Sequence, residues 1–544
     1  MTARPIAFFT IDHGTATTAA AIIGQLDGRF RLLAAGAQPA GISADGLLAG
    51  LVAEVAAIEP DVLPDPTTWS DWRRLESATH RPPRALVAAA SETGLGAAEA
   101  AVAAAGWRVV GRISPERTDA LAATERCLDP DVELLVVATA DPVPAEERDA
   151  LADLVALVAA ALGRRDDEPT LVLAGGAAGV MQRFPAARVV LGPAPLPHPH
   201  AGADPLRDLL VALDQALIAG AGGPAAGFPD GRRALVTATA SLAAVLDRRV
   251  ELVDVGATAG LRVLVGPGGV RGAIVSAEGA LTPPDVIEDD RRADGVLQWS
   301  TIRADAASMR DRVRNLAIAP WRDAAGDGAR LRLAAARAAL ARLDAAWRLP
   351  DDAEDRPASY GTDLLVASGG AFAVAPAPAV ALALVDTLRR PGGMTLAHDH
   401  ARVLAPIGGL ADEADRRRLL ADLLGDVLAP LGSAIVAAGL HAGRHRGTVR
   451  ITSEDGADMR IELVPGGVQL VDLPPGVAAT AELTTRDGLW LGVRAHHFAL
   501  PVAGGLGGLV VDTREIPLRL PERPERRRDL LDAWQRPLWA GADT

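Results

Sequence analysis

Two aspartates, Asp12 and Asp254, each lie at the end of an apolar run and begin an Asp-x-Gly turn rich in small residues. A second apolar run, a short turn and a third run follow each of them. Residues 8–36 and 250–279 therefore predict the same β-meander built twice. Glycine lets a backbone approach an anion closely, and successive N–H groups in such a turn form an anion-binding concavity. The repeat predicts a phosphate site between two similar domains that face a cleft.

The side chains at the two turns are of the types that hold a phosphate and its magnesium ion. Thr15, Thr17 and Thr18 supply hydroxyl donors. Asp12 and Asp254 are expected to hold Mg²⁺ or its waters, because this ion takes one or two carboxylates and keeps several waters. A single Asp-x-Gly turn also closes an ordinary hairpin. Two copies in matching strand context favour a nucleotide cleft over that alternative.

The composition excludes several functional classes. No lysine occurs in the chain, so all 55 Lys and Arg residues are arginines. A Walker-type phosphate loop, a protein kinase and Schiff-base catalysis each need a lysine, and all three are excluded. The net charge of −14, without a basic tract, argues against nucleic acid as a partner. Cys127 is the single cysteine, which excludes disulfide frameworks and cysteine-based zinc sites and predicts a buried, neutral thiol.

Length and hydrophobicity indicate how many domains the chain forms and where in the cell it is expected. A chain of 544 residues is too long for one core and predicts about three domains. Hydrophobic residues make up 49% and aromatics only 3%, so Ala, Leu and Val must fill the interior. The N-terminus does not have the form of a signal peptide, and the Ala-rich runs are too short to span a bilayer. A cytoplasmic protein without membrane association is expected.

Strands alternate with helices through most of the chain, which predicts parallel sheets with covered faces. Ligands bind at the carboxyl ends of such strands, where Asp12, Ser91, Asp141 and Gly175 are expected. From about residue 441, short strands separated by turn residues predict an antiparallel barrel or sandwich. The glycine run 504–508 lies between two of these strands and predicts a flexible hairpin rather than a phosphate loop.

The order of these motifs resembles the actin, Hsp70 and sugar-kinase superfamily of ATPases. Asp-x-Gly-Thr-x-x-Thr, a second Asp-x-Gly and Ser-Gly-Gly-Ala occur at residues 12–18, 254–256 and 368–371. More narrowly, the chain resembles the glutamate mutase L-type (MutL-like) proteins of cobalamin mutase systems. The supporting stretches span nearly the whole chain: residues 11–19, 30–39, 86–94, 132–141, 254–258, 364–371, 396–410, 507–520 and 526–534.

The resemblance implies an α/β fold in which two actin/Hsp70-like (ribonuclease H-like) domains face a cleft, with a small C-terminal β-rich region. The implied division is a first ATPase half at 1–191, a linker at 192–233, a second half at 234–440 and the β-rich region with a terminal helix at 441–544. It also implies ATP and Mg²⁺ as ligands. The family role is that of a chaperone-like, slow ATPase that protects or restores an adenosylcobalamin-dependent mutase whose cofactor is damaged.

Site residues follow from the resemblance by position. Asp12 and Asp254 would act as the catalytic and metal-binding carboxylates. The nucleotide-binding residues would be Gly14, Thr15, Thr17 and Thr18 in the first loop, Gly256 and Thr258 in the second, and Ser368, Gly369 and Gly370 beside the nucleoside.

Three departures leave alternatives open. Ala257 stands where the second loop usually has glycine, Ala259-Gly260 removes hydroxyl donors, and His13 replaces an apolar residue. A non-hydrolysing binding scaffold with a degenerate cleft would carry its function on the C-terminal β region and terminal helix. A small-molecule kinase of the same superfamily would use Asp141 or Asp399 as general base, although a strand-end carboxylate is also a frequent helix cap.

Overall fold

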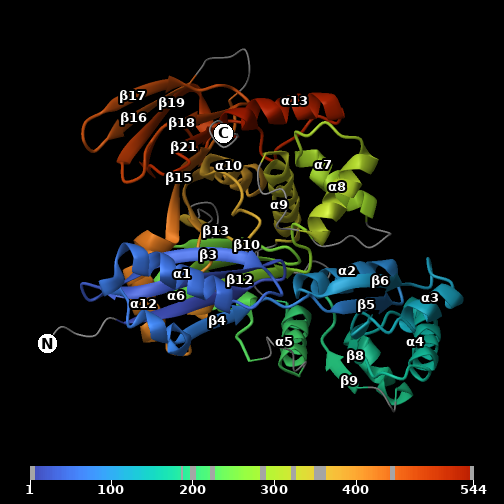
Figure 1. Ribbon diagram of the computed structural model, residues 1–544. Helices are drawn as coiled ribbons and strands as arrows, with labels where there is room; N and C mark the ends of the chain where they lie inside the picture. The colour runs from blue at the N-terminus through green and yellow to red at the C-terminus, as the bar shows by residue number, and fades with distance from the viewer. Residues whose placement is uncertain are drawn as a thin grey trace.

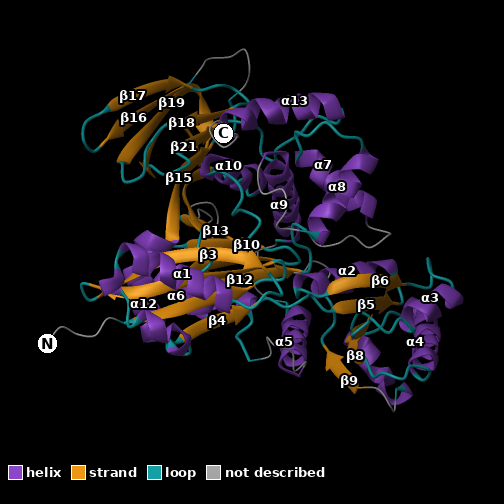
Figure 2. Cartoon of the chain, viewed as in Figure 1, coloured by secondary structure: helices purple, strands orange, loops and turns teal. Residues whose placement is uncertain are grey.

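The computed structural model describes residues 6–184, 188–196, 204–220, 227–281, 289–319, 326–347, 363–440 and 447–539. Strands in these ranges form four sheets (Figures 1 and 2). The two sheets that carry Asp12 and Asp254 share a hydrophobic core. The other two sheets lie at the periphery of the molecule, one beside the first pair and one above it in Figure 1.

The first sheet has the strand order β3-β2-β1-β4. Its strands are β1 (Ala7–His13), β2 (Thr17–Leu26), β3 (Arg29–Pro39) and β4 (Arg74–Ala78). The meander from β1 to β3 is antiparallel, as predicted, and β4 runs parallel to β1. Successive side chains of a strand point to opposite faces. Phe9 and Ile11 therefore pack against α1 (Asp45–Ile58), while Phe8 packs into the core shared with the second half.

The second sheet repeats this arrangement and extends it. Its order is β12-β11-β10-β13-β14-β15-β21-β18. The meander β10 (Val250–Val255), β11 (Gly260–Gly266) and β12 (Gly269–Ser276) is again antiparallel, and β13 (Leu364–Ser368) is parallel to β10. The predicted internal repeat is thus confirmed. Four further strands follow: β14 (Gly392–Asp399), β15 (Leu428–Val436), β21 (Leu509–Asp512) and β18 (Val468–Val471).

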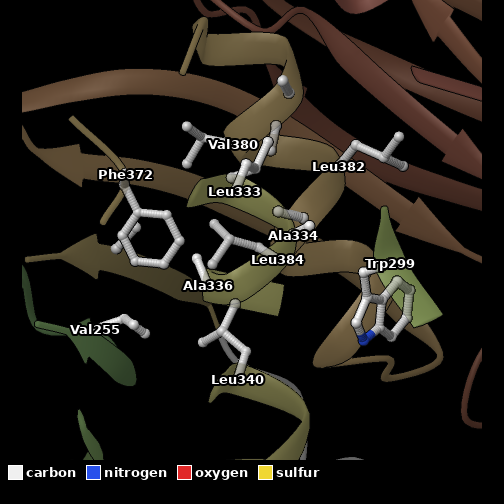
Figure 3. Close-up of a cluster of buried hydrophobic side chains, with 14 of the residues drawn as sticks. Val255, Trp299, Leu333, Ala334, Ala336, Leu340, Phe372, Val380, Leu382 and Leu384 are labelled. Atoms are coloured by element: carbon white, nitrogen blue, oxygen red, sulfur yellow. The ribbon is translucent and has the colours of Figure 1, made fainter. Parts of the chain in front are cut away.

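Helices cover one face of the second sheet. They are α7 (Asp289–Trp299), α8 (Ala306–Ile318), α9 (Gly326–Ala346) and α10 (Ala377–Thr387). Figure 3 shows how Leu333 and Leu340 of α9 and Leu384 of α10 pack with Val255 and Phe372.

The opposite face of the second sheet turns toward the first half. Helices α6 (Gly231–Leu246), α11 (Leu404–Gly408) and α12 (Glu413–Val427) fill the space between the two sheets. The backbone N–H groups of Phe30 and Leu32 on β3 donate to Asp422 and Asp426 of α12, each at 3.1 Å. Helix α11 crosses α6 so closely that a Cβ on Gly408 would lie 1.9 Å from a backbone oxygen of α6. These helices join the two halves.

The third sheet is inserted between β4 and α6 and is fully parallel. Its order is β6-β5-β7-β8-β9, from β5 (Arg84–Ala89), β6 (Arg108–Ile113), β7 (Leu134–Ala138), β8 (Thr170–Ala174) and β9 (Arg188–Gly192). Helices α2 (Glu92–Ala104) and α5 (Pro205–Gly220) cover one face, and α3 (Ala120–Cys127) and α4 (Arg148–Leu162) cover the other.

This separate sheet corrects one expectation. Ser91, Asp141 and Gly175 follow β5, β7 and β8, so they do not share a sheet edge with Asp12. An apolar run shows that a segment is a buried strand, but it does not show which sheet the strand joins.

The C-terminal strands contribute to two sheets. The fourth sheet, β17-β16-β19-β20, is antiparallel, as predicted, and comprises β16 (Thr448–Ser453), β17 (Asp458–Glu462), β19 (Ala478–Trp490) and β20 (Arg494–Ala503). It packs on β15 and β21 of the second sheet. Residues 504–508 cross between these sheets. A Cβ on Gly504 would lie 2.0 Å from the Pro474 oxygen, so the predicted flexible hairpin is wrong.

Buried ion pairs tie the C-terminal region to the second half. Arg337 on α9 contacts Asp386 on α10 at 2.9 Å. Arg514 contacts Asp386 at 2.8 Å and Asp512 on β21 at 2.7 Å. Its guanidinium also lies 4.3 Å from the ring of Trp534 on α13 (Pro524–Gln535). The terminal helix is therefore held against the second half.

Short 3-10 helices cover Pro60–Val62, Pro66–Asp71, Ala145–Glu147, Gly175–Arg183 and Arg536–Trp539. Within the described ranges, no helix combines the length and the apolar character needed to cross a bilayer. The boundaries of the four-part division remain a prediction.

The α6–α11 crossing predicts the effect of a single methyl group. Gly408→Ala is expected to lower the free energy of unfolding by about 1–3 kcal/mol, because the two helices must separate to admit the Cβ. Gly425→Ala on α12 is the matched control, since its Cβ would meet no atom within 4 Å. That variant is expected to gain about 0.5–1 kcal/mol. Urea denaturation measures both, and equal effects would contradict the close crossing.

Candidate functional site

The two Asp-x-Gly turns have the same backbone structure. In the first, the Gly14 N–H donates to the Thr17 oxygen at 3.1 Å. In the second, the Gly256 N–H donates to the Ala259 oxygen at 2.9 Å. Each turn follows the first strand of a meander and leads into the second strand. The turns are therefore equivalent in structure, although their sequences differ.

Each aspartate is also paired with a serine on the neighbouring parallel strand. Asp12 lies beside Ser77 of β4, and Asp254 lies beside Ser368 of β13. The Ser77 hydroxyl donates to Asp12 Oδ1 at 3.2 Å. Ser368 donates to Asp399 Oδ2 at 3.2 Å, and it also lowers the pKa of the neighbouring Asp254 carboxyl group. Ser77 was not found from the sequence, because the short strand β4 has only a weak hydrophobic pattern.

The turns of the two halves meet at one cavity. Thr15 Oγ1 and Thr258 Oγ1 lie 2.9 Å apart across it. Of the predicted residues, Asp12, Gly14, Thr15, Thr17, Asp254, Gly256, Thr258, Gly369 and Gly370 line the cavity. Thr18 and Ser368 are buried and lie outside the lining. The tertiary structure thus brings together residues more than 350 positions apart in the chain.

The solvent-accessible space in this cavity is small, about 80 Å³. That space holds roughly five to eight waters. The hydrogen bond between Thr15 and Thr258 joins the two turns across this space.

Glycines allow the second half to reach the turns. Gly369 has φ +98°, in the left-handed region that favours glycine. A Cβ there would lie 2.4 Å from the Val255 oxygen and 2.7 Å from Asp254 Oδ1. A Cβ on Gly370 would point toward Thr17 Oγ1 at 3.4 Å. Gly369 therefore lies against the second turn and Gly370 against the first, while the place of Ser368, Gly369 and Gly370 beside a nucleoside remains a prediction.

The buried carboxylates interact unfavourably when both are ionised. Burial and the nearby carboxylates of Asp12 and Asp399 together raise the pKa of Asp254 to about 7, against Arg402 and Ser368, which lower it. Burial also raises the pKa of Asp12, while Arg402, Ser77 and His13 lower it. A cation placed between the two groups would relieve this repulsion. Oxygen donors of this kind suit Mg²⁺.

The described residues hold no group of three or more His, Cys, Asp or Glu side chains arranged to bind a metal. A magnesium ion at Asp12 and Asp254 would therefore need waters or ligand oxygens to complete its shell, which is the usual way this ion is bound. Asp12 and Asp254 are chemically suited to such an ion. The protein would supply these two carboxylates, and waters and phosphate oxygens would supply the other ligands.

Arg402, like Ser77, is a residue of this site that the sequence analysis missed. It follows β14 with φ +54° and extends from the second half to the first turn. Its Nη1 donates to Thr17 Oγ1 at 3.0 Å and lies 3.7 Å from Asp12 Oδ2. The signal available in the sequence was chemical: a phosphate site without lysine needs another cation.

The sequence departures have separate structural outcomes. His13 does not line the cavity, because its Nε2 is bonded to Glu76 at 2.8 Å and its ring stacks on Phe228. Ala257 and Ala259 do line it, so the second turn presents methyl groups where the first presents hydroxyls. The second turn therefore offers fewer donors to a phosphate than the first.

The two kinase candidates lie outside the cavity lining. Asp141 is exposed and follows β7 in the inserted sheet. Asp399 is buried, accepts the N–H groups of Val403 and Leu404 at 3.1 and 3.4 Å, and thus caps α11. Burial raises the pKa of the Cys127 thiol to about 11, in agreement with a neutral cysteine.

No family model and no curated protein matches the chain. Among solved structures, the chain is similar to a nucleotide-free acetone carboxylase, an enzyme of ATP-dependent acetone carboxylation. The two chains are 12% identical with a TM-score of 0.24, and the match covers 84% of this chain and 81% of the carboxylase chain. Component A of (R)-2-hydroxyglutaryl-CoA dehydratase from Acidaminococcus fermentans is 10% identical with a TM-score of 0.25, covering 74% and 96%. The ethanolamine utilization protein EutJ from Carboxydothermus hydrogenoformans is 9% identical with a TM-score of 0.23, covering 74% and 88%. Similarity this weak carries no argument about function.

The chain's own topology establishes its architecture. Two meanders of the same strand order, each with a parallel fourth strand and an Asp-x-Gly turn, face one cavity. The fold is mixed α/β: two halves that repeat this strand arrangement face each other, and a C-terminal antiparallel sheet is added to them, as predicted from the sequence.

The raised pKa of Asp254 predicts how stability depends on pH. The ordinary value is 3.8, so the folded state binds the extra proton between about pH 4 and 7, and wild-type stability falls as pH rises through that window. In Mg²⁺-free buffer, Asp254→Asn is expected to make this fall shallower and to gain about 1–2 kcal/mol by pH 8. Urea denaturation at several pH values, with exposed Asp141→Asn as control, measures this. Parallel profiles for wild type and Asp254→Asn would contradict it.

Proposed function

We propose that the chain binds ATP with Mg²⁺ in the cleft between its two halves. The observation that carries this proposal is the meeting of two equivalent Asp-x-Gly turns at one cavity, with Thr15 and Thr258 2.9 Å apart. Backbone N–H groups and short hydroxyls in such turns are suited to phosphate oxygens. The described residues hold no metal-binding cluster that competes with this interpretation.

Each part of the cavity has a role in this proposal. The turn at Gly14, Thr15 and Thr17 holds the terminal phosphates, and Gly256 with Thr258 approaches from the facing half. Gly369 and Gly370 pass beside the nucleoside. Asp12 and Asp254 hold the waters of Mg²⁺, whose charge neutralises the phosphates when it is bound. The same carboxylates would orient an attacking water.

Turnover is expected to be slow. Hydrolysis depends on donors aimed at the charge that develops on the phosphate, and each donor contributes strongly in a water-poor site. Ala257 and Ala259 remove hydroxyl donors from the second turn. A nucleotide that contacts both turns would separate Thr15 from Thr258, so binding and release involve a movement of the two halves. Slow opening and slow chemistry suit a conformational switch rather than a metabolic kinase.

The first prediction of this proposal concerns ligand-dependent stability. Millimolar Mg-ATP is expected to raise the melting temperature of the wild type, because a ligand that binds the folded state stabilises it by mass action. Asp12→Ala is expected to abolish most of the rise. Asp141→Ala is the matched control, since this exposed aspartate follows a strand of a different sheet, and should keep the full rise. No rise in the wild type would favour the scaffold with a degenerate cleft.

We further propose that an adenosylcobalamin-dependent mutase binds the chain and distinguishes its conformations with and without nucleotide. The resemblance to glutamate mutase L-type proteins supports this choice of partner. The test is to inactivate such a mutase by damaging its cofactor and then to add the chain with Mg-ATP and fresh cofactor. Recovery of activity is expected with the wild type and not with Asp12→Ala. Equal recovery without the chain would refute the partner role and leave ATP binding untouched.

A further inference from the structure

Arg402 occupies an unusual position between the halves. It lies between the end of β14 and the start of α11, the helix that crosses α6. Its backbone is in the left-handed region, at φ +54°, which is uncommon for a residue with a side chain. This conformation directs a side chain of the second half toward the first turn. An uncommon backbone held at such a point indicates a specific task.

The guanidinium is only partly satisfied by the protein. Nη1 donates to Thr17 Oγ1 at 3.0 Å and to the Thr17 oxygen at 3.4 Å, and lies 3.7 Å from Asp12 Oδ2. Nη2 is buried and has no hydrogen-bond partner. A buried charged donor without an acceptor is costly. The same side chain lines the cavity, where a ligand oxygen could supply the acceptor.

The cavity needs a cation that the chain cannot supply as lysine. Two arginines line it, Arg402 and Arg332. Arg402 lies close enough to lower the pKa values of Asp12 and Asp254, so its charge acts on both turns. The absence of a side chain at Gly370 leaves room beside it, since a Cβ there would lie 3.5 Å from Nη1.

We propose that Arg402 binds the terminal phosphates of the nucleotide from the second half. In the ligand-free protein it lies on Thr17 and near Asp12. When the phosphates enter, its fork of N–H groups turns to their oxygens, and Asp12 is released to the waters of the metal. An arginine fork matches phosphate oxygens in pairs and keeps its charge at any physiological pH. This inference rests on the proposed nucleotide site and assigns Arg402 as the residue that recognises the charge of the phosphates.

One consequence is selectivity for phosphate number. The first turn belongs to one half and Arg402 to the other, so only a ligand with terminal phosphates contacts both. A nucleoside lacks the charged oxygens that Thr17 and Arg402 would bind. Phosphate charge would therefore draw the two halves together directly.

The test compares ligands that differ in phosphate content. Binding of ATP, inorganic tripolyphosphate and adenosine, with Mg²⁺ present, is measured by calorimetry for the wild type and three variants. Arg402→Met is expected to weaken ATP and tripolyphosphate roughly 10- to 100-fold, and adenosine less than about twofold, because only phosphates lose a charged hydrogen-bond donor. Arg402→Lys keeps the charge and loses the fork, so a smaller but equally selective loss is expected.

Arg418→Met, on the exposed side of α12, is the matched control and should bind all three ligands as the wild type does. Equal weakening of ATP and adenosine by Arg402→Met would overturn the proposal and leave Arg402 as a structural latch. Unchanged ATP binding in that variant would overturn it while the proposed function stands. A wild type that binds neither ATP nor tripolyphosphate would overturn both. Should Arg402→Met fail to fold, Arg402→Lys decides by the same comparison.

Discussion

The central constraint in this molecule is the placement of two carboxylates, Asp12 and Asp254, at one small cavity between two halves. Burial raises the pKa values of both carboxylates, and the charge of Asp12 adds to the rise at Asp254. The surrounding groups lower both pKa values: Ser77 donates to Asp12, Ser368 lies beside Asp254, and Arg402 lies beside Asp12. The repulsion that remains favours a bound cation, and a bound cation attracts phosphate. The arrangement is costly without a ligand and suited to one with metal and phosphate.

The rest of the fold holds the two turns against each other. The two sheets share a core that includes α6, α11 and α12. Helices α6 and α11 are in backbone contact at Gly408. The inserted parallel sheet is tied to the second half, since Ala105 pairs with Val275 of β12. The C-terminal helix is tied to the same half through Arg514. A change in the cleft would therefore move peripheral surfaces that a partner could recognise.

Sequence reasoning predicted the elements whose patterns are local. The two meanders, the Asp-x-Gly turns and the Ser-Gly-Gly segment were found because strand periodicity and glycine spacing can be recognised in short stretches of consecutive residues. It missed Ser77 and Arg402, whose importance lies in what they face across the fold. It also assigned Asp141 to the wrong sheet edge, since an apolar run of five residues has no information about its neighbours. The glycine-rich composition of residues 504–508 predicted flexibility. In the structure, other backbone atoms lie so close to these glycines that a Cβ would not fit.

The sequence by itself determined the repeated architecture, the absence of lysine chemistry and the residue types available to a phosphate. These follow from periodicity and composition, which need no coordinates. Only the tertiary structure decided that the two turns share one cavity, that Asp399 caps a helix there instead of facing a substrate, and that Arg402 reaches across from the second half. The physical reason is distance along the chain. Thr17 and Arg402 are separated by 385 residues, and contacts of that range are set by how sheets and helices pack, not by any local preference.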